Sequence, residues 1–364
     1  MDAVPATPRS TAAAKITSAD AAIRSRNSPM IHTQTFARVG LIGNPSDGYY
    51  GKTISAIVRN FSAKVTLFES PRLTILPHRC DRSEFTGLED LVQDVRENGY
   101  YGGIRLIKAS IKRFYDYCTE RDQPLGNRTF SIEYTSDIPV RVGLAGSSAI
   151  VTATLKAMMQ FFGIYIPRET LPDLALSVEL DELGIGAGLQ DRVIQIYEGV
   201  QFMDFNRDLI TGRGYGDYEE LDPGLLPPLF VVYQQQLAEG TEVPHNDLRA
   251  RFNRGEPVVL EAMQRFAALA QEARDLILAG RGMEIGPLMD ENFNLRSRLL
   301  PISPGNRAMI ETGRSVGAFV KFAGSGGTLI GTYDGDPERW RRIQDAYARV
   351  GATVFVPQIE PMGS

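Results

Sequence analysis

A loop of small residues that runs directly into a long apolar segment constrains the fold of this chain more than any other feature. It reads VRVGLAGSSAIVTATLKAMMQFFG and covers residues 140–163. The spacing predicts a helix from Ser148 to Phe162, ended by Gly163 in a position that glycine favours after a helix. Glycine lets the backbone approach a ligand closely, and the first N–H groups of a helix are free to bind an anion. The segment is therefore either a packed glycine turn or an anion-binding loop.

Two further glycine-rich segments accompany this loop. RVGLIGNPSDGYYGKT covers residues 38–53 and KFAGSGGT covers residues 321–328. Each of them alone is more often a structural turn than a binding site. None has the Gly-Lys-Ser/Thr spacing of a Walker loop. The segment GIGAGL at 184–189 follows a predicted helix rather than a strand, which argues against a dinucleotide-binding fold.

Alternating and helical patterns elsewhere predict an α+β chain. The order strand, turn, strand, helix, strand near the C-terminus favours an antiparallel sheet covered by helices. The expected strands are 36–43, 62–70, 129–139, 229–236, 352–358 and two within 317–335, and the expected helices are 101–120, 172–183, 189–197, 257–280 and 337–350.

The Pro- and Gly-rich segment DPGLLPP at 222–228 predicts a domain boundary. We expect an N-terminal domain over 31–222 and a C-terminal domain over 223–364. Residues 1–30 are rich in Ala, Ser, Thr, Pro and Arg and poor in large apolar residues, which predicts a disordered tail. A transit peptide is the alternative interpretation of this tail.

Composition excludes several classes of partner. The chain has 364 residues and a formal net charge of −5, so it offers no basic field for nucleic acid or an anionic membrane. No apolar run reaches the roughly 18 to 20 residues that span a bilayer. The two cysteines give no disulfide framework, and the three histidines lie far apart without metal-ligand spacing. We expect a soluble cytoplasmic protein, and the sequence carries no signal of its oligomeric state.

The three glycine-rich segments together resemble the motifs of the GHMP small-molecule kinases. Residues 139–149 are similar to the family's P-x-x-x-G-L-G-S-S-A motif with one residue inserted, and RVGLIGNPSD resembles its N-terminal R-V-N-L-I-G-E-H-T-D segment. KFAGSGGTLIG is similar to the C-terminal K-x-T-G-A-G-G-G turn. The phrases GNPSDGYYGKTIS, VGLAGSSAIV and GIGAGLQDRV are most similar to the glucuronokinase branch. The resemblance implies a two-domain α+β fold with a ferredoxin-like C-terminal domain.

The resemblance also implies ATP as the phosphoryl donor and Mg²⁺ as its cation. Phosphoryl transfer needs N–H donors around the phosphates, a cation on their oxygens and a positioned acceptor hydroxyl. The implied magnesium ligands are Ser148 and Glu179. The inserted residue leaves Ser147 as the alternative serine, and Glu182 could share the helix face of Glu179. The implied nucleotide-binding residues are Gly143, Leu144, Ala145, Gly146, Ser147, Ser148 and Ala149 in the loop, and Gly324, Ser325 and Gly326 in the C-terminal turn.

Three charged residues complete the site that the resemblance implies. Asp191 matches the catalytic base of the family, although an Asp in the first turn of a helix is also a common cap. Arg38 matches an arginine near the transferring phosphate, with a surface arginine at a strand edge as the alternative. Asp47 matches a residue that accepts hydrogen bonds from sugar hydroxyls, and the alternative is an Asp-Gly turn.

The implied reaction is phosphorylation of the anomeric hydroxyl of D-glucuronate, a small-molecule substrate. A buried carboxylate needs a cation or several donors, and Lys52 is the expected partner, with a solvated lysine as the alternative. Arg59 is the other basic residue near the implied sugar site, and Arg105 and Lys108, on a predicted helix, are weaker candidates. Another GHMP kinase that acts on a different sugar or small alcohol, or a non-catalytic sensor of sugar and ATP, remains as an alternative function.

Overall fold

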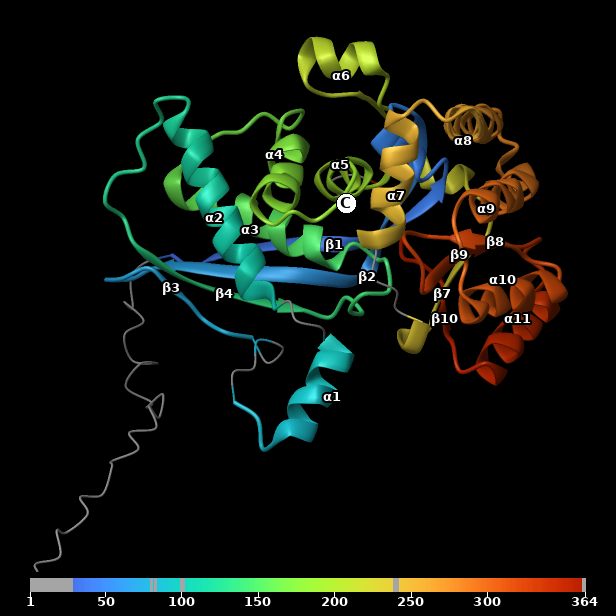
Figure 1. Cartoon of the computed structure of the whole chain (residues 1–364), viewed down its shortest axis with the longest axis horizontal. Coiled ribbons are helices and arrows are strands. Elements are labelled where there is room, and N and C mark those ends of the chain that lie inside the picture. Colours follow the sequence, from blue (N-terminus) through green and yellow to red (C-terminus); the bar gives the residue numbers. More distant parts are fainter. Residues whose placement is uncertain (1–28, 79–80, 82–83, 99–101, 238–241, 362–364) are drawn as a thin grey trace, which may run out of the picture.

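The computed structural model of the chain describes residues 29–78, 81, 84–98, 102–237 and 242–361 (Figure 1). The tail predicted over residues 1–30 lies outside the described residues, apart from Pro29 and Met30. Helices are interspersed with strands along the chain, and the strands form two sheets (Figure 1). The fold is therefore α+β, as the sequence patterns predict.

The first sheet has six strands and is organised around one very long strand. This strand, β2 (Lys52–Glu69), pairs with β1 (Ile31–Ile42) along one edge. Its other edge pairs with β4 (Phe130–Ser136) over residues 63–69 and with β5 (Val200–Asp204) over residues 52–56. All of these pairs are antiparallel, and β6 (Asp217–Leu221) and the short β3 (Thr74–Ile75) complete the sheet.

Helices cover one face of this sheet (Figure 1). The predicted apolar helix is α3 (Gly146–Phe162), and it packs against β1 and β2. Most of its residues are buried, which explains why it is apolar on almost every side. The neighbouring helices are α2 (Gly103–Thr119), α4 (Leu171–Ser177), which continues as a π-helical turn over Val178–Glu182, and α5 (Gln190–Tyr197); α1 (Leu88–Asn98) and α6 (Arg207–Arg213) lie at the periphery.

The second sheet has four antiparallel strands in the order β10-β7-β9-β8. Its strands are β7 (Leu229–Tyr233), β8 (Phe319–Phe322), β9 (Thr328–Thr332) and β10 (Thr353–Phe355). Helices connect β7 to β8 and β9 to β10, so this order is ferredoxin-like and confirms that prediction. The helices are α7 (Glu242–Asn253), α8 (Pro257–Leu278), α9 (Gly286–Leu299), α10 (Pro304–Ser315) and α11 (Pro337–Arg349).

The largest hydrophobic core runs from one sheet into the other. It contains Val39 and Ile54 of the first sheet together with Val231 and Ile330 of the second. Sheet membership changes between β6 and β7, but the division into two domains at residue 222 stays a prediction because this core is continuous. Within the described residues, no helix is both long enough and apolar enough to cross a bilayer.

Candidate active site

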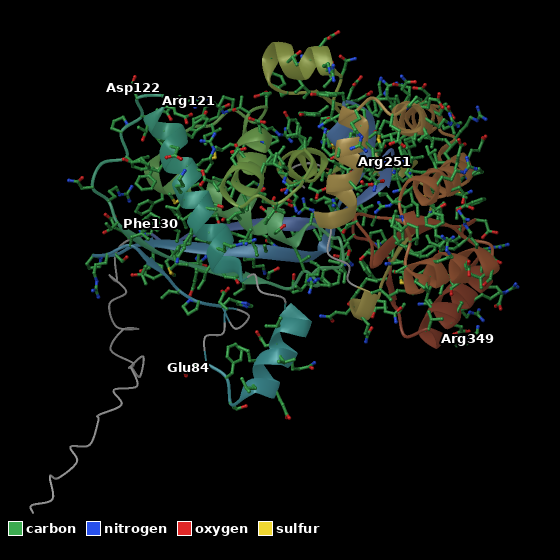
Figure 2. All side chains as sticks on the ribbon, in the orientation of Figure 1. Glu84, Arg121, Asp122, Phe130, Arg251 and Arg349 are labelled. Carbon is green, nitrogen blue, oxygen red and sulfur yellow. The ribbon has the colours of Figure 1, made fainter. Side chains whose placement is uncertain are left out.

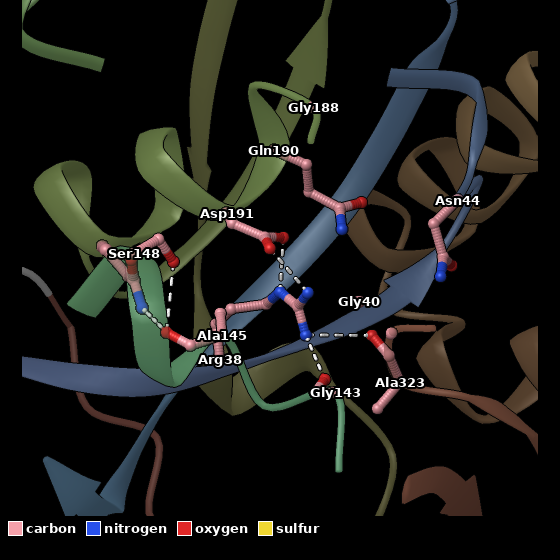
Figure 3. A network of polar contacts seen from close by, with 12 residues as sticks. Arg38, Gly40, Asn44, Gly143, Ala145, Ser148, Gly188, Gln190, Asp191 and Ala323 are labelled. Carbon is pink, nitrogen blue, oxygen red and sulfur yellow. Dashed lines mark hydrogen bonds and ion pairs between the residues drawn. The ribbon is translucent and has the colours of Figure 1, made fainter. Parts of the chain in front are cut away.

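Arg38 on β1 joins three other segments of the chain (Figure 3). Its Nε donates to Asp191 Oδ1 at 2.6 Å and its Nη2 donates to Asp191 Oδ2 at 2.8 Å. Its Nη1 donates to the backbone oxygen of Gly143 at 2.6 Å and to that of Ala323 at 3.4 Å. The structure thus brings together the first helical turn of α5, the loop before α3 and the glycine turn after β8. Arg38 is 5% exposed, so it is not a surface arginine.

Further buried bonds tie β1 to the same turn of the second sheet. The N–H of Gly40 donates to Ala323 O at 2.8 Å. The ammonium group of Lys321 donates to Gly40 O at 2.8 Å and to Asn44 Oδ1 at 2.6 Å. Burial lowers the pKa of Lys321 well below its ordinary value. These contacts fix the glycine turn relative to β1.

The loop before α3 and the glycine turn after β8 pack so closely that side chains would not fit between them. Gly143 has a φ of +80°, and a β-carbon built on it would lie 2.9 Å from Gly326 O. A β-carbon on Gly324 would overlap the backbone oxygen of Gly143 and lie 3.0 Å from Arg38 Nη1. Glycine is therefore required sterically at both positions.

Ser147 and Glu179 form an oxygen pair beside the loop. Ser147 Oγ donates to Glu179 Oε1 at 2.8 Å. Both residues line a cavity that the loop before α3 also lines. The carboxylate of Glu179 also makes an ion pair with Arg192, and both side chains are nearly fully buried. Burial lowers the pKa of Arg192 to about 9. This pair partly compensates the cost of burying two charges.

The predicted magnesium ligand Ser148 points away from the cavity. It is 1% exposed, and its Oγ donates to Ala145 O at 3.1 Å (Figure 3). The alternative serine, Ser147, is the one that meets Glu179. The alternative acid, Glu182, pairs with Lys112 at 2.7 Å and does not line the cavity. The geometry therefore favours Ser147 with Glu179.

These residues fit a nucleotide phosphate and a magnesium ion. The loop supplies backbone N–H groups at the start of α3, which suit phosphate oxygens. Ser147 and Glu179 supply one hydroxyl and one carboxylate oxygen, which suit an ion that keeps several waters and phosphate ligands. Among the residues that the structure describes, no three His, Cys, Asp or Glu side chains gather as a metal site. A metal here would thus depend on the nucleotide for most of its ligands.

Asp47 lies opposite the start of α5. It belongs to a short 3₁₀ helix (Ser46–Tyr49), and its Oδ2 accepts a hydrogen bond from the N–H of Gln190 at 3.3 Å. Burial and, to a smaller extent, the neighbouring Asp191 carboxylate raise the pKa of Asp47 to about 6, although the Gln190 N–H and Arg38 act to lower it. A β-carbon at Gly188 would overlap Asp47 Oδ2. The glycine at position 188 therefore makes room for this carboxylate.

Asp191 is directed at Arg38 rather than used as a helix cap. Helix α5 begins after Leu189, and no side chain caps its first turn. The carboxylate of Asp191 is 21% exposed, so it keeps access to the cavity while Arg38 holds it. Because a carboxylate can accept about four hydrogen bonds, the pair with Arg38 leaves room for a ligand hydroxyl.

Arg38, Asp47, Glu179, Asp191 and the loop of residues 143–147 line one cavity of about 1100 Å³. Lys52, the expected partner of a substrate carboxylate, is not among its lining residues. It makes an ion pair with Asp204 at 3.0 Å and donates to Gln271 Oε1 at 2.9 Å. Asp204 faces Lys52 directly in the pairing of β2 with β5. The structure therefore gives Lys52 a cross-strand partner in place of a ligand.

The remaining predicted residues divide between the cavity and its surroundings. Leu144, Ala145, Gly146 and Ser325 line it, whereas Ala149 and Gly326 do not. Of the other basic residues considered for the carboxylate, Arg105 lines the cavity. Arg59 instead pairs with Glu198 and Glu360, and Lys108 is exposed.

Sequence reasoning missed several residues of this site, among them Gln190, Arg192 and Arg249. Gln190 and Arg192 flank Asp191 and line the cavity, and the polar run QDR was the available signal. Arg249 on α7 also lines the cavity, where it donates to the backbone oxygen of Gly48. No motif surrounds Arg249, so only the fold reveals its position.

Comparisons with known proteins find relatives of this chain. The model of the GHMP kinases N terminal domain matches residues 105–199. Glucuronokinase 1 of Arabidopsis thaliana is 38% identical over 337 residues, which cover 91% of this chain and 92% of that protein. Probable glucuronokinase 2 of the same plant is 37% identical and covers 93% and 94%. The structure of Lactococcus lactis galactokinase complexed with galactose superposes with a TM-score of 0.71 at 14% identity, covering 94% of this chain and 97% of that one.

Proposed function

The chain belongs to the GHMP kinase family, and from this premise we propose that it transfers the γ-phosphoryl group of ATP to the anomeric hydroxyl of D-glucuronate. As a member of this family with glucuronokinases as relatives, it is an ATP-dependent sugar kinase. The identity of the sugar and of its reacting hydroxyl are the proposed parts. The observation that carries the proposal is that Asp191, Asp47 and the loop of residues 143–147, called the phosphate loop below, line one cavity.

In the proposed site the loop of residues 143–147 holds the phosphates of the nucleotide. Its backbone N–H groups and the N-terminus of α3 supply donors that need no rearrangement when negative charge develops on the phosphate. Ser147 and Glu179 would hold a magnesium ion, which neutralises charge on the phosphate oxygens. Arg192 keeps the Glu179 carboxylate in place through their ion pair.

Asp191 is the proposed general base. Its carboxylate accepts the proton of the acceptor hydroxyl and orients that oxygen toward the phosphate. Arg38 fixes the carboxylate through two hydrogen bonds, so the base is positioned before the sugar binds. Asp47 is the proposed acceptor of hydrogen bonds from other hydroxyls of the sugar. Positioning of this kind accounts for much of the rate of phosphoryl transfer.

Glucuronate is the proposed acceptor because the two relatives that cover nearly the whole chain are named for it. The test measures ADP release with D-glucuronate, D-glucose and D-galactose, and with 1-O-methyl glucuronide, whose anomeric oxygen is blocked. We expect glucuronate to be preferred by about 10³-fold or more in kcat/KM, because a site built for a carboxylate is left with an unpaired charge by a neutral sugar. We also expect no turnover of the methyl glucuronide.

A matched variant, Asp191→Asn, shows whether ADP release depends on this site. Equal rates on glucuronate and galactose would overturn the choice of substrate and leave a kinase for another sugar. Turnover of the methyl glucuronide would overturn the anomeric position. Binding of sugar and ATP without any ADP release would indicate a sensor.

A further inference from the structure

Six arginines line the cavity, and they differ in what they already contact. Arg38 pairs with Asp191, and Arg192 pairs with Glu179. Arg296 donates to the backbone oxygens of Gly324 and Ser325 and supports the glycine turn. The other three are Arg105 on α2, Arg141 just before the phosphate loop, and Arg249 on α7. These three arginines come from different segments of the chain.

Arg249 is the one that contacts the segment of Asp47. Its Nη2 donates to the backbone oxygen of Gly48, the residue that follows Asp47. A β-carbon on Gly48 would lie 3.2 Å from the same nitrogen, so the guanidinium lies against the glycine. Within the described residues, Arg249 forms no ion pair with a carboxylate. Its charge is therefore available at the edge of the proposed sugar site.

Two contacts fix the direction of this guanidinium. It lies over the ring of Tyr49 at 4.3 Å from the centroid, in a cation–π arrangement. Tyr49 is 7% exposed and packs on Phe252, which lies on α7 like Arg249, with ring centroids 4.9 Å apart. The Gly48 contact uses part of the donor set, and an arginine has five N–H donors in all. Donors thus remain to bind both oxygens of a carboxylate.

Helix α7 itself is anchored to its neighbours. Arg251, labelled in Figure 2, donates to both oxygens of Glu256 at 3.0 and 2.8 Å and to Leu299 O at 3.0 Å. Leu248 is fully buried in a cluster with Tyr49 and Phe266. Arg249 therefore lies between two residues of α7 that are fixed in place, Leu248 by packing and Arg251 by hydrogen bonds.

We propose that Arg249 binds the carboxylate of the acceptor sugar and so selects a uronic acid over a neutral sugar; this inference rests on the proposed function. A sugar that donates its hydroxyls to Asp47 lies beside Gly48, where the guanidinium is held. The planar fork of arginine matches the two oxygens of a carboxylate. Arg249 acts in binding and specificity and takes no part in proton transfer. It fills the role that we expected of Lys52 from the sequence.

The experiment compares glucuronate with glucuronamide, which has the same shape and no charge. kcat/KM for each is measured with ATP for the wild-type chain, Arg249→Met, Arg249→Lys and Arg254→Met. Arg254 is an exposed cation just beyond α7 that does not line the cavity, so its variant controls for loss of charge near this helix. Thermal unfolding of each variant verifies that it is folded.

We expect the wild-type chain and Arg254→Met to prefer glucuronate over glucuronamide by about 10²-fold or more, since charge-assisted pairs are strong and specific. Arg249→Met should abolish most of this preference through the KM for glucuronate, while kcat/KM for glucuronamide changes little. Arg249→Lys should retain part of the preference, because it keeps the charge and loses the fork.

The outcomes separate this inference from the proposed function. A folded Arg249→Met chain that keeps the full preference overturns the role of Arg249 and leaves glucuronate as the substrate. An equal loss with both compounds also overturns it, because that result indicates a general structural role. A wild-type chain that does not use glucuronate overturns the proposed function instead, and the inference with it.

Discussion

Gly188 and Asp47 share one small space at the edge of the cavity: a β-carbon on the glycine would overlap Oδ2 of the carboxylate. Gly188→Ala should therefore displace Asp47 from the N–H of Gln190. We expect kcat/KM for the sugar to fall by about 10²-fold, the effect of a displacement near 1 Å, with nucleotide affinity unchanged. Steady-state kinetics and titration with a nucleotide analogue measure the two effects. Gly212→Ala, in helix α6 with open space around it, is the control that should keep full activity.

Removing the proton acceptor tests the role of Asp191. Asp191→Asn keeps the shape of the side chain, and we expect turnover to fall by about 10²- to 10⁴-fold while ATP binding is kept. Asp181→Asn is the control, because it removes the same charge from an exposed position in the π-helical turn Val178–Glu182. An Asp191→Asn chain with more than half of the wild-type rate would mean that the carboxylate only orients Arg38.

Adjacent serines give a matched pair for the magnesium site. Ser147→Ala removes the hydroxyl that meets Glu179, so the Mg²⁺ concentration needed for half-maximal activity should rise several-fold. Ser148→Ala removes a hydroxyl bonded to Ala145 O and should leave that concentration unchanged. Magnesium titrations of the two variants decide between them. The opposite order would return the ligand to Ser148.

Glu179 supports the fold as well as the proposed metal. Glu179→Gln removes the closest charged partner of the buried Arg192 and leaves it Asp191 Oδ2, 3.7 Å from its Nη1, so the change should cost up to about 3 to 5 kcal/mol of folding free energy. The double variant Glu179→Gln/Arg192→Met should regain part of this stability without regaining activity. Urea unfolding and steady-state rates measure both quantities. Equal stability of the single variant and the wild type would show that the ion pair contributes little.

The raised pKa of Asp47 makes stability depend on pH. In the folded chain its pKa is about 6, against 3.8 for the ordinary group, so the folded state binds the proton more tightly than the unfolded state. This contribution is present below pH 4 and is lost as the pH rises to 6, by up to about 3 kcal/mol. Asp47→Asn removes that loss. Its Tm should therefore exceed the wild-type Tm most at pH 7 and least near pH 4, and a constant difference would contradict the assignment.

The sequence was sufficient for the parts of the fold that depend on local pattern. The loop before α3, the helix itself and the glycine turn between β8 and β9 lie where their composition indicates. The helices α9 and α10 were not predicted, because buried polar residues such as Asn292 and Asn306 interrupt their apolar faces. The strands β5 and β6 were missed as well, because β5 is buried along four of its five residues and β6 carries three acidic residues, so neither gives a clear alternation of apolar and polar residues.

The prediction of individual site residues was limited by register and by backbone conformation. Lys52 pairs with Asp204 because β2 and β5 meet in one particular register, which periodicity does not specify. The choice between Ser147 and Ser148 depends on Ala145, which adopts a φ of +62° and lets α3 begin at Gly146. The sequence pattern indicated a start at Ser148, two residues later than the structure shows.

The bonds between Gly40 and Ala323 and between Lys321 and Gly40 determine how the cavity can exchange its contents with water. Hinge opening between the two sheets would break these buried hydrogen bonds, each of which contributes about 0.5 to 1.5 kcal/mol, and would separate the continuous core as well. That cost would recur in every catalytic cycle. Release of product therefore takes less energy through a change in the side walls of the cavity than through separation of its two halves.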